Sequence, residues 1–110
     1  MGSSTTRLFH LALARDWAAA RAAGEYTVST RGRTLVEEGF IHASRADQWA
    51  GVRERFYADV TEPLVLLVID PSRLTAQVRE EAVPGLDETF PHIYGPIDLD
   101  AVVEVVALGQ

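Results

Sequence analysis

Six consecutive apolar residues, Leu64 to Ile69, constrain the fold of this chain more than any other feature of its sequence. A strand with one face in water alternates apolar and polar residues, whereas a strand buried on both faces is apolar throughout. The pair Asp70-Pro71 ends the run sharply. We therefore expect this segment to form a central strand that is covered on both faces.

Other segments are predicted to form strands around this one. The stretch Gln77 to Glu81 is more polar and is typical of a strand nearer the edge of a sheet, with a turn following at Pro84-Gly85. The remaining predicted strands are Arg7 to Leu13, Tyr26 to Thr30, Phe40 to Ser44 and Ala101 to Leu108.

Two or three short helices are predicted in the first half of the chain. Asp16 is expected to cap a helix over Trp17 to Ala23, which Gly24 ends. Thr34 and Glu37 have the spacing of a capping box, and Gly39 ends the brief segment that they begin.

A further helix is expected to begin at Ser44 or Asp47 and to run through Asp59. Apolar residues recur in it at helical spacing, and this stripe is expected to pack in the core. Its members are Trp49, Val52, Phe56 and Tyr57.

Length and element order predict one compact α+β domain. The chain has 110 residues, of which 47 % are hydrophobic, and this is enough for one core and one pocket. Helices come early and strands late. We expect the domain to cover 7–110 after a flexible N-terminus at 1–6.

Charge and residue types exclude several classes of function. Ten basic residues against sixteen acidic ones give a net charge of -6, which disfavours nonspecific binding to nucleic acid or anionic membranes. The basic residues are all arginine, so no lysine can form a Schiff base, and the lack of cysteine removes disulfides and thiolates. With no signal peptide and no membrane span recognisable, we expect a cytoplasmic protein.

The three histidines, His10, His42 and His92, each lie in a short apolar segment that is predicted to be a strand. Imidazole can donate, accept or exchange a proton near neutral pH. Three such placements predict one polar site in a cleft on an otherwise apolar scaffold. A histidine that makes a core hydrogen bond would show the same pattern, so the structural alternative stays open.

Alternation along the strands pairs these histidines with other aromatic residues. Phe40 and His42 share one face of their segment, and His92 and Tyr94 share a face if theirs is extended. Pro91, Gly95 and Pro96 fix the backbone around the second pair. A rigid backbone that presents two polar aromatic residues suits a binding site, although a structural corner would use the same residues.

Taken together, these segments resemble the DUF952 family of small bacterial proteins, a domain of unknown function. The resemblance covers nearly the whole chain. It rests on Phe9-His10-Leu11-Ala12, Ser29-Thr30-Arg31-Gly32, Gly39-Phe40-Ile41-His42-Ala43-Ser44, Phe56-Tyr57, Pro63 to Asp70 and Phe90-Pro91-His92-Ile93-Tyr94-Gly95-Pro96. Many members of the family have cysteine where this chain has Ala43, so thiol chemistry cannot operate here.

The family in turn resembles the ADP-ribosyltransferase superfamily, and in motif style the RNA 2′-phosphotransferases. This resemblance implies a split antiparallel β core that binds NAD, with His10 on the ligand and His42, His92 and Tyr94 bordering the same cleft as catalytic candidates. It also implies ligand-binding roles for the residues Ser29, Thr30, Arg31, Arg33, Phe40 and Ser44, with the two arginines on a diphosphate. The glutamate motif of protein-modifying members is missing, Glu88 is only a loose substitute, and the arginine-histidine set of the phosphotransferases is incomplete.

Two functions therefore stay open. One is a transferase or glycohydrolase that acts on NAD or a related nucleotide through an oxocarbenium-like state, which requires mainly positioning and a polar group near the ribose. The other is a small-ligand-binding or regulatory module that uses the same cleft without turnover. A zinc site formed by the three histidines has no local ligand motif to support it, so no metal is expected. The oligomeric state is left open.

Overall fold

The structure, a computed structural model, describes residues 6–109. Most of the segment expected to be a flexible N-terminus, 1–5 of 1–6, lies outside the described residues, and so does residue 110. The described residues form one α+β domain, as the order of elements predicts. Its helices are α1 (Ala14–Ala23), α2 (Leu35–Glu38) and α3 (Trp49–Phe56), with 3-10 turns at Pro71–Arg73 and Leu99–Ala101. Its strands are β1 (Leu8–Leu13), β2 (Glu25–Tyr26), β3 (Val28–Thr30), β4 (Arg33–Thr34), β5 (Ile41–His42), β6 (Leu64–Ile69), β7 (Gln77–Ala82), β8 (Thr89–Tyr94), β9 (Ile97–Asp98) and β10 (Val102–Gly109).

The core sheet consists of β1, β6 and β10, with the predicted central strand β6 between the other two and antiparallel to both. Alternate residues of β6 enter two separate apolar clusters on the two faces of the sheet: Leu67 and Ile69 enter one, and Leu64 and Leu66 enter the other. The continuous apolar run is thereby explained, because both faces of β6 are covered by apolar side chains.

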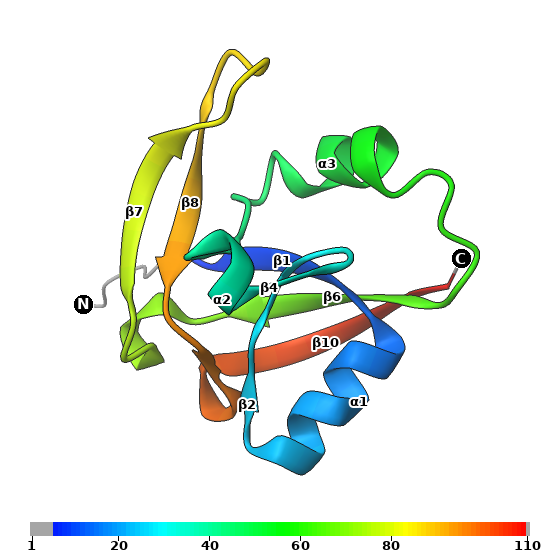
Figure 1. Cartoon of the computed structure of the whole chain (residues 1–110), viewed down its shortest axis with the longest axis vertical. Coiled ribbons are helices and arrows are strands. Elements are labelled where there is room, and N and C mark those ends of the chain that lie inside the picture. Colours follow the sequence, from blue (N-terminus) through cyan, green and yellow to red (C-terminus); the bar gives the residue numbers. More distant parts are fainter. Residues whose placement is uncertain (1–5, 110) are drawn as a thin grey trace.

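A second antiparallel sheet, in the order β5-β8-β7, packs against the core sheet, and β7 is at its edge as predicted. Ile41 and Ile93, which are cross-strand partners, point into the core cluster. The next pair along, His42 and His92, therefore lies on the opposite face. Figure 1 shows the β7–β8 hairpin projecting beyond the core sheet, with α3 at a distance from its tip.

Glycines end two of the helices where the sequence predicts, and the predicted capping box begins one of them. Gly24 follows α1 and Gly39 follows α2, each with a positive φ, and the capping box of Thr34 and Glu37 is present. The cap predicted at Asp16 is wrong. The helix α1 begins at Ala14 directly after β1, so Asp16 lies in its first turn.

The predicted start of α3 is also wrong, because the N-cap is Gln48. Ser44 cannot begin the helix, since its backbone pairs with that of Phe9 in an isolated bridge that ties β1 to the second sheet. Asp47 makes no cap either. The helix ends at Phe56, three residues before the predicted end.

The aromatic stripe on α3 is only partly in the core. Tyr57, just after the helix, is buried, whereas Trp49 and Val52 are half-buried and Phe56 is 46 % exposed. Helical spacing marks an apolar face but does not say how closely another surface covers it. Here Val52, Phe56 and Tyr57 form one wall of a cavity. Among the described residues, no helix is long and apolar enough to cross a membrane.

Candidate functional site

A cavity of about 250 Å³ lies between α3, the tip of the β7–β8 hairpin and the strands β1 and β5. Most of its surface is apolar, and its polar groups come from Thr30, Tyr57 and the segment around β5. It is lined by Phe9, His10, Leu11, Thr30, His42, Ala43, Ser44, Val52, Phe56, Tyr57, Val83, Leu86 and Phe90. The cavity lies beside α3, whose N-cap residue Gln48 is hydrogen-bonded to Glu88 and to the carbonyl of Thr89 on the hairpin.

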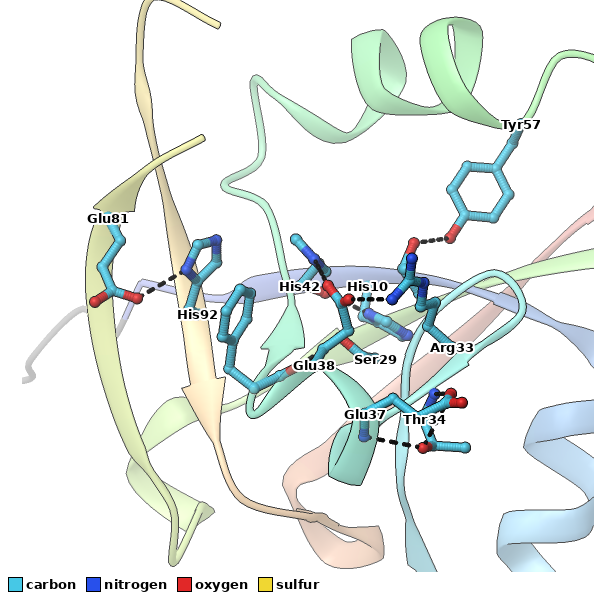
Figure 2. Close-up of polar contacts among 12 residues, drawn as sticks. His10, Ser29, Arg33, Thr34, Glu37, Glu38, His42, Tyr57, Glu81 and His92 are labelled. Carbon is cyan, nitrogen blue, oxygen red and sulfur yellow. Dashed lines mark hydrogen bonds and ion pairs between the residues drawn. The ribbon is translucent and has the colours of Figure 1, made fainter. Parts of the chain in front are cut away.

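His42 lines this cavity and is oriented by a carboxylate. Its Nε2 is 3.2 Å from Oε1 of Glu38, and the other oxygen of Glu38 accepts a hydrogen bond from Arg33 at 3.1 Å. Glu38 is the last residue of α2, and Gly39, with φ of 89°, reverses the chain so that β5 starts beside it. Burial lowers the pKa of His42 below its ordinary value, although the bond to Glu38 opposes this, so the neutral form is favoured at neutral pH. Figure 2 shows the contacts that run from Arg33 through Glu38 to His42.

His10 is held by hydrogen bonds at both ring nitrogens. Its Nδ1 donates to the backbone carbonyl of His42 at 2.5 Å, and its Nε2 accepts from the hydroxyl of Tyr26 at 2.9 Å. Burial lowers the pKa of His10 to about 4 and raises that of Tyr26, so both are neutral near pH 7. His10 borders the cavity, but its nitrogens fix the position of β5 and β2 against β1.

His92 is also buried but is bonded at one nitrogen only. Its Nδ1 lies 2.9 Å from Oε1 of Glu81 on the neighbouring strand, and the same carboxylate accepts a hydrogen bond from the hydroxyl of Tyr94. These two bonds lower the pKa of Glu81. The ring of Phe40 stacks on His92 with centroids 4.0 Å apart. The buried Nε2 of His92 has no hydrogen-bond partner among the described residues.

The structure brings the three predicted histidines together, but only His10 and His42 line the cavity. The rings of His42 and His92 pack edge to face with centroids 5.2 Å apart, so His92 lies directly beside the cavity wall. Tyr94 is on the outer side of the second sheet and is 36 % exposed.

The predicted ligand-binding residues fall into two groups. Thr30 and Ser44 line the cavity, and Thr30 is bonded to the hydroxyl of Tyr57 at 3.2 Å. The others make contacts within the protein. Ser29 is fully buried and donates to the carbonyl of Phe40, whose ring covers His92. Arg31 pairs with Asp59 and donates to the carbonyl of Phe56. Arg33 pairs with Glu38.

Sequence reasoning missed the two carboxylates that orient the histidines. Glu38 precedes His42 by four residues, but the helix ends between them, so helical spacing could not have identified the pair. Glu81 meets His92 through the register of β7 on β8. Glu88, the loose substitute for a catalytic glutamate, instead accepts a hydrogen bond from Gln48 at 2.7 Å. Within residues 6–109, no group of three or more histidine or acidic side chains is arranged to hold a metal ion.

These features define a small α+β domain with a largely apolar cavity that is lined in part by a carboxylate-oriented histidine. The chain belongs to the DUF952 family, described as a protein of unknown function, which it matches over residues 11–105. This confirms the family resemblance that the motifs predict.

The fold is also similar to that of solved structures of protein CC0527 from Caulobacter crescentus. The X-ray structure matches with 26 % identity and a TM-score of 0.78, over 93 % of this chain and 85 % of that one. The solution NMR structure of CC0527 gives 26 % identity and a TM-score of 0.75, over 94 % and 85 % of the two chains. Comparison with curated proteins gave no match.

Proposed function

We propose that this domain binds a small ligand that places one flat, largely apolar ring in the cavity and a hydrogen-bonding edge against His42. The observation that carries the proposal is the cavity itself, with its largely apolar walls and a few polar groups, His42 among them. At about 250 Å³ it has room for a single ring with a substituent and is smaller than the usual site for a drug-sized ligand. A nucleobase or the nicotinamide ring of NAD has this size and chemistry.

The cations near the cavity limit how a whole dinucleotide would bind. Arg31 and Arg33, the two candidates for a diphosphate, are paired with Asp59 and Glu38. A guanidinium that already makes a paired contact gains less from a new anion, because it must give up the first one. The ring of the ligand therefore occupies the cavity, and any phosphates lie over its rim.

A second candidate function is turnover of NAD or a related nucleotide by a transferase or glycohydrolase. It is favoured by the contact from Arg33 through Glu38 to His42, which orients an imidazole at the cavity. An oriented polar group beside the ribose is the main requirement for cleavage through an oxocarbenium-like state. The resemblance to ADP-ribosyltransferases supports the same candidate.

Direct titration shows which small molecule the cavity binds. Nicotinamide, adenine, ADP-ribose and NAD are titrated into the protein, with binding followed by calorimetry and by thermal shift, since a ligand that binds only the native state raises its apparent stability. We expect His42→Ala to weaken binding of the best of these by about tenfold or more, equivalent to about 1.4 kcal/mol.

The fold should tolerate this change, because the ring of His42 is about a third exposed and, within residues 6–109, the hydrogen bond of its side chain is to Glu38 alone. Val36→Ala, at a site 93 % exposed on α2, is the matched control and should alter neither quantity. A His42→Ala protein that loses stability but binds as before would contradict the proposal, and so would a wild type that binds none of the four compounds. Chromatography of NAD incubated with the wild type separates turnover from binding, because a glycohydrolase releases nicotinamide and a binding module does not.

A further inference from the structure

The buried Nε2 of His92 has no partner among the described residues, and buried polar groups in folded proteins are nearly always hydrogen-bonded. The ring cannot turn to satisfy it. Phe40 stacks on one face, and Glu81 holds Nδ1, while Glu81 is itself held by Tyr94. The position of this buried nitrogen is therefore fixed, and a hydrogen-bond donor that reaches it would find an acceptor already in place.

The surroundings decide which chemistry such a group has. The lowered pKa of Glu81 keeps its carboxylate ionised, and this carboxylate accepts the hydrogen bond from Nδ1 of His92. In the imidazole tautomer that carries its proton on Nδ1, the other nitrogen, Nε2, presents a lone pair. His42 repeats the arrangement. Its Nε2 faces the carboxylate of Glu38, so its Nδ1 is the nitrogen left without a proton, and no hydrogen bond to Nδ1 is found in residues 6–109. Two acceptors, each backed by a carboxylate, favour a ligand that donates.

The two acceptors are also close together and close to the cavity. His42 and His92 are direct cross-strand partners, and their ring centroids are 5.2 Å apart. Phe90, two residues before His92 on the same face of β8, lines the cavity, as does His42. Figure 2 shows the second nitrogen of His92 turned away from Glu81, on the side of the ring of His42. Because Nε2 of His92 is buried, a ligand that reaches it must displace a neighbouring side chain on the side that faces His42.

We propose that His42 and His92 form a two-acceptor subsite that selects ligands with an N–H-bearing head group, such as a carboxamide, amine or amidine, and rejects carboxylates and phosphates there. This inference rests on the proposed function, because the apolar part of the ligand occupies the cavity. It adds the polarity of the head group, which the cavity alone leaves open.

The test uses three compounds that share one ring and differ in the head group: benzamide, benzamidine and benzoate. Each is titrated into the wild type and followed by NMR. We expect benzamide and benzamidine to bind about tenfold or more tightly than benzoate, because a carboxylate brings no donor and is repelled by Glu38 and Glu81. His92→Phe keeps the stacking on Phe40 and removes the acceptor, so it should reduce this preference to less than about threefold. Gln77→Ala, on the exposed surface of β7, is the control and should keep it.

A direct readout covers the case in which His92→Phe does not fold. Long-range ¹H–¹⁵N spectra of the wild-type histidines report the protonation of each nitrogen, and we expect the unprotonated Nε2 of His92 to shift on addition of benzamide. Benzoate binding as tightly as benzamide, or an unchanged Nε2 resonance, would overturn the subsite and leave the cavity proposal standing. If none of the three compounds binds, the subsite fails, and the nicotinamide and adenine titrations decide separately whether the cavity proposal fails with it.

Discussion

His10 and His92 are equally buried, at 3 % exposure each, yet the regions around them differ in kind. His10 belongs to the core sheet, and both of its ring nitrogens have a partner from another strand. His92 belongs to the second sheet, and among the residues that the structure describes only its nitrogen facing Glu81 has a partner. Burial alone therefore does not separate a structural histidine from a candidate functional one. The hydrogen-bond partners of the two ring nitrogens do separate them.

The difference follows from how the two sheets are covered. The core sheet has apolar clusters on both faces, so a polar group within it must find its partner in the protein. The outer face of the second sheet is covered by single side chains such as Phe40, and α3 stands away from it across the cavity. A polar group on this face can therefore lack a hydrogen-bond partner within the protein and form its hydrogen bond with a ligand.

The largest effect should come from the core sheet. Leu67 is fully buried at the centre of β6, and Leu67→Ala should lower the free energy of unfolding by about 2–5 kcal/mol, because it removes buried methyl groups and leaves a cavity. Val103→Ala on β10, at a site 40 % exposed, is the matched control and should cost less than about 1 kcal/mol. Urea denaturation measures both. If both variants lost a similar amount of unfolding free energy, the core would not depend on the burial of β6.

A smaller effect should appear in the pH dependence of stability. The pKa of His10 is lowered from 6.5 to about 4, so the unfolded chain binds its proton first and the folded state loses stability as pH falls below about 6.5. Between pH 7 and pH 5 the loss attributable to His10 should be about 2 kcal/mol.

The variant His10→Gln keeps a donor and an acceptor but does not titrate. Unfolding free energies of this variant and of the wild type at both pH values isolate the contribution, since the other histidines are common to the two proteins. A wild type whose pH dependence equals that of the variant would contradict a neutral, buried His10.

The smallest effect compares the tyrosines that serve the two histidines. Tyr26→Phe removes the donor to His10 and leaves its Nε2 buried and unpaired, which should cost about 1.5 kcal/mol. Tyr94→Phe removes a donor to Glu81, which still holds His92, and because Tyr94 is partly exposed this should cost less than about 0.5 kcal/mol. Thermal and urea unfolding of both variants rank them. The reverse order would show that the second sheet depends on its polar network as much as the core sheet depends on His10.

The sequence by itself determined the local and strongly patterned parts of this protein. The unbroken apolar run predicted β6 as a buried central strand, glycines predicted the ends of α1 and α2, and the spacing of Thr34 and Glu37 predicted a capping box. Each of these signals depends on neighbours a few residues apart, so no knowledge of the fold was needed. The motifs around the histidines predicted the family from short segments of sequence as well.

Only the tertiary structure decided which histidine nitrogens are free and which side chains orient them. The partner of His92 depends on the register of β7, the partners of His10 come from positions 16 and 32 residues away, and the cavity depends on where α3 stands relative to the hairpin. The pattern of apolar residues along the strands would be the same if His92 were bonded at both ring nitrogens and His10 at only one. Alternation assigns a side chain to a face of a sheet, but hydrogen-bond partners and open space are set by the packing of elements that are distant in the sequence.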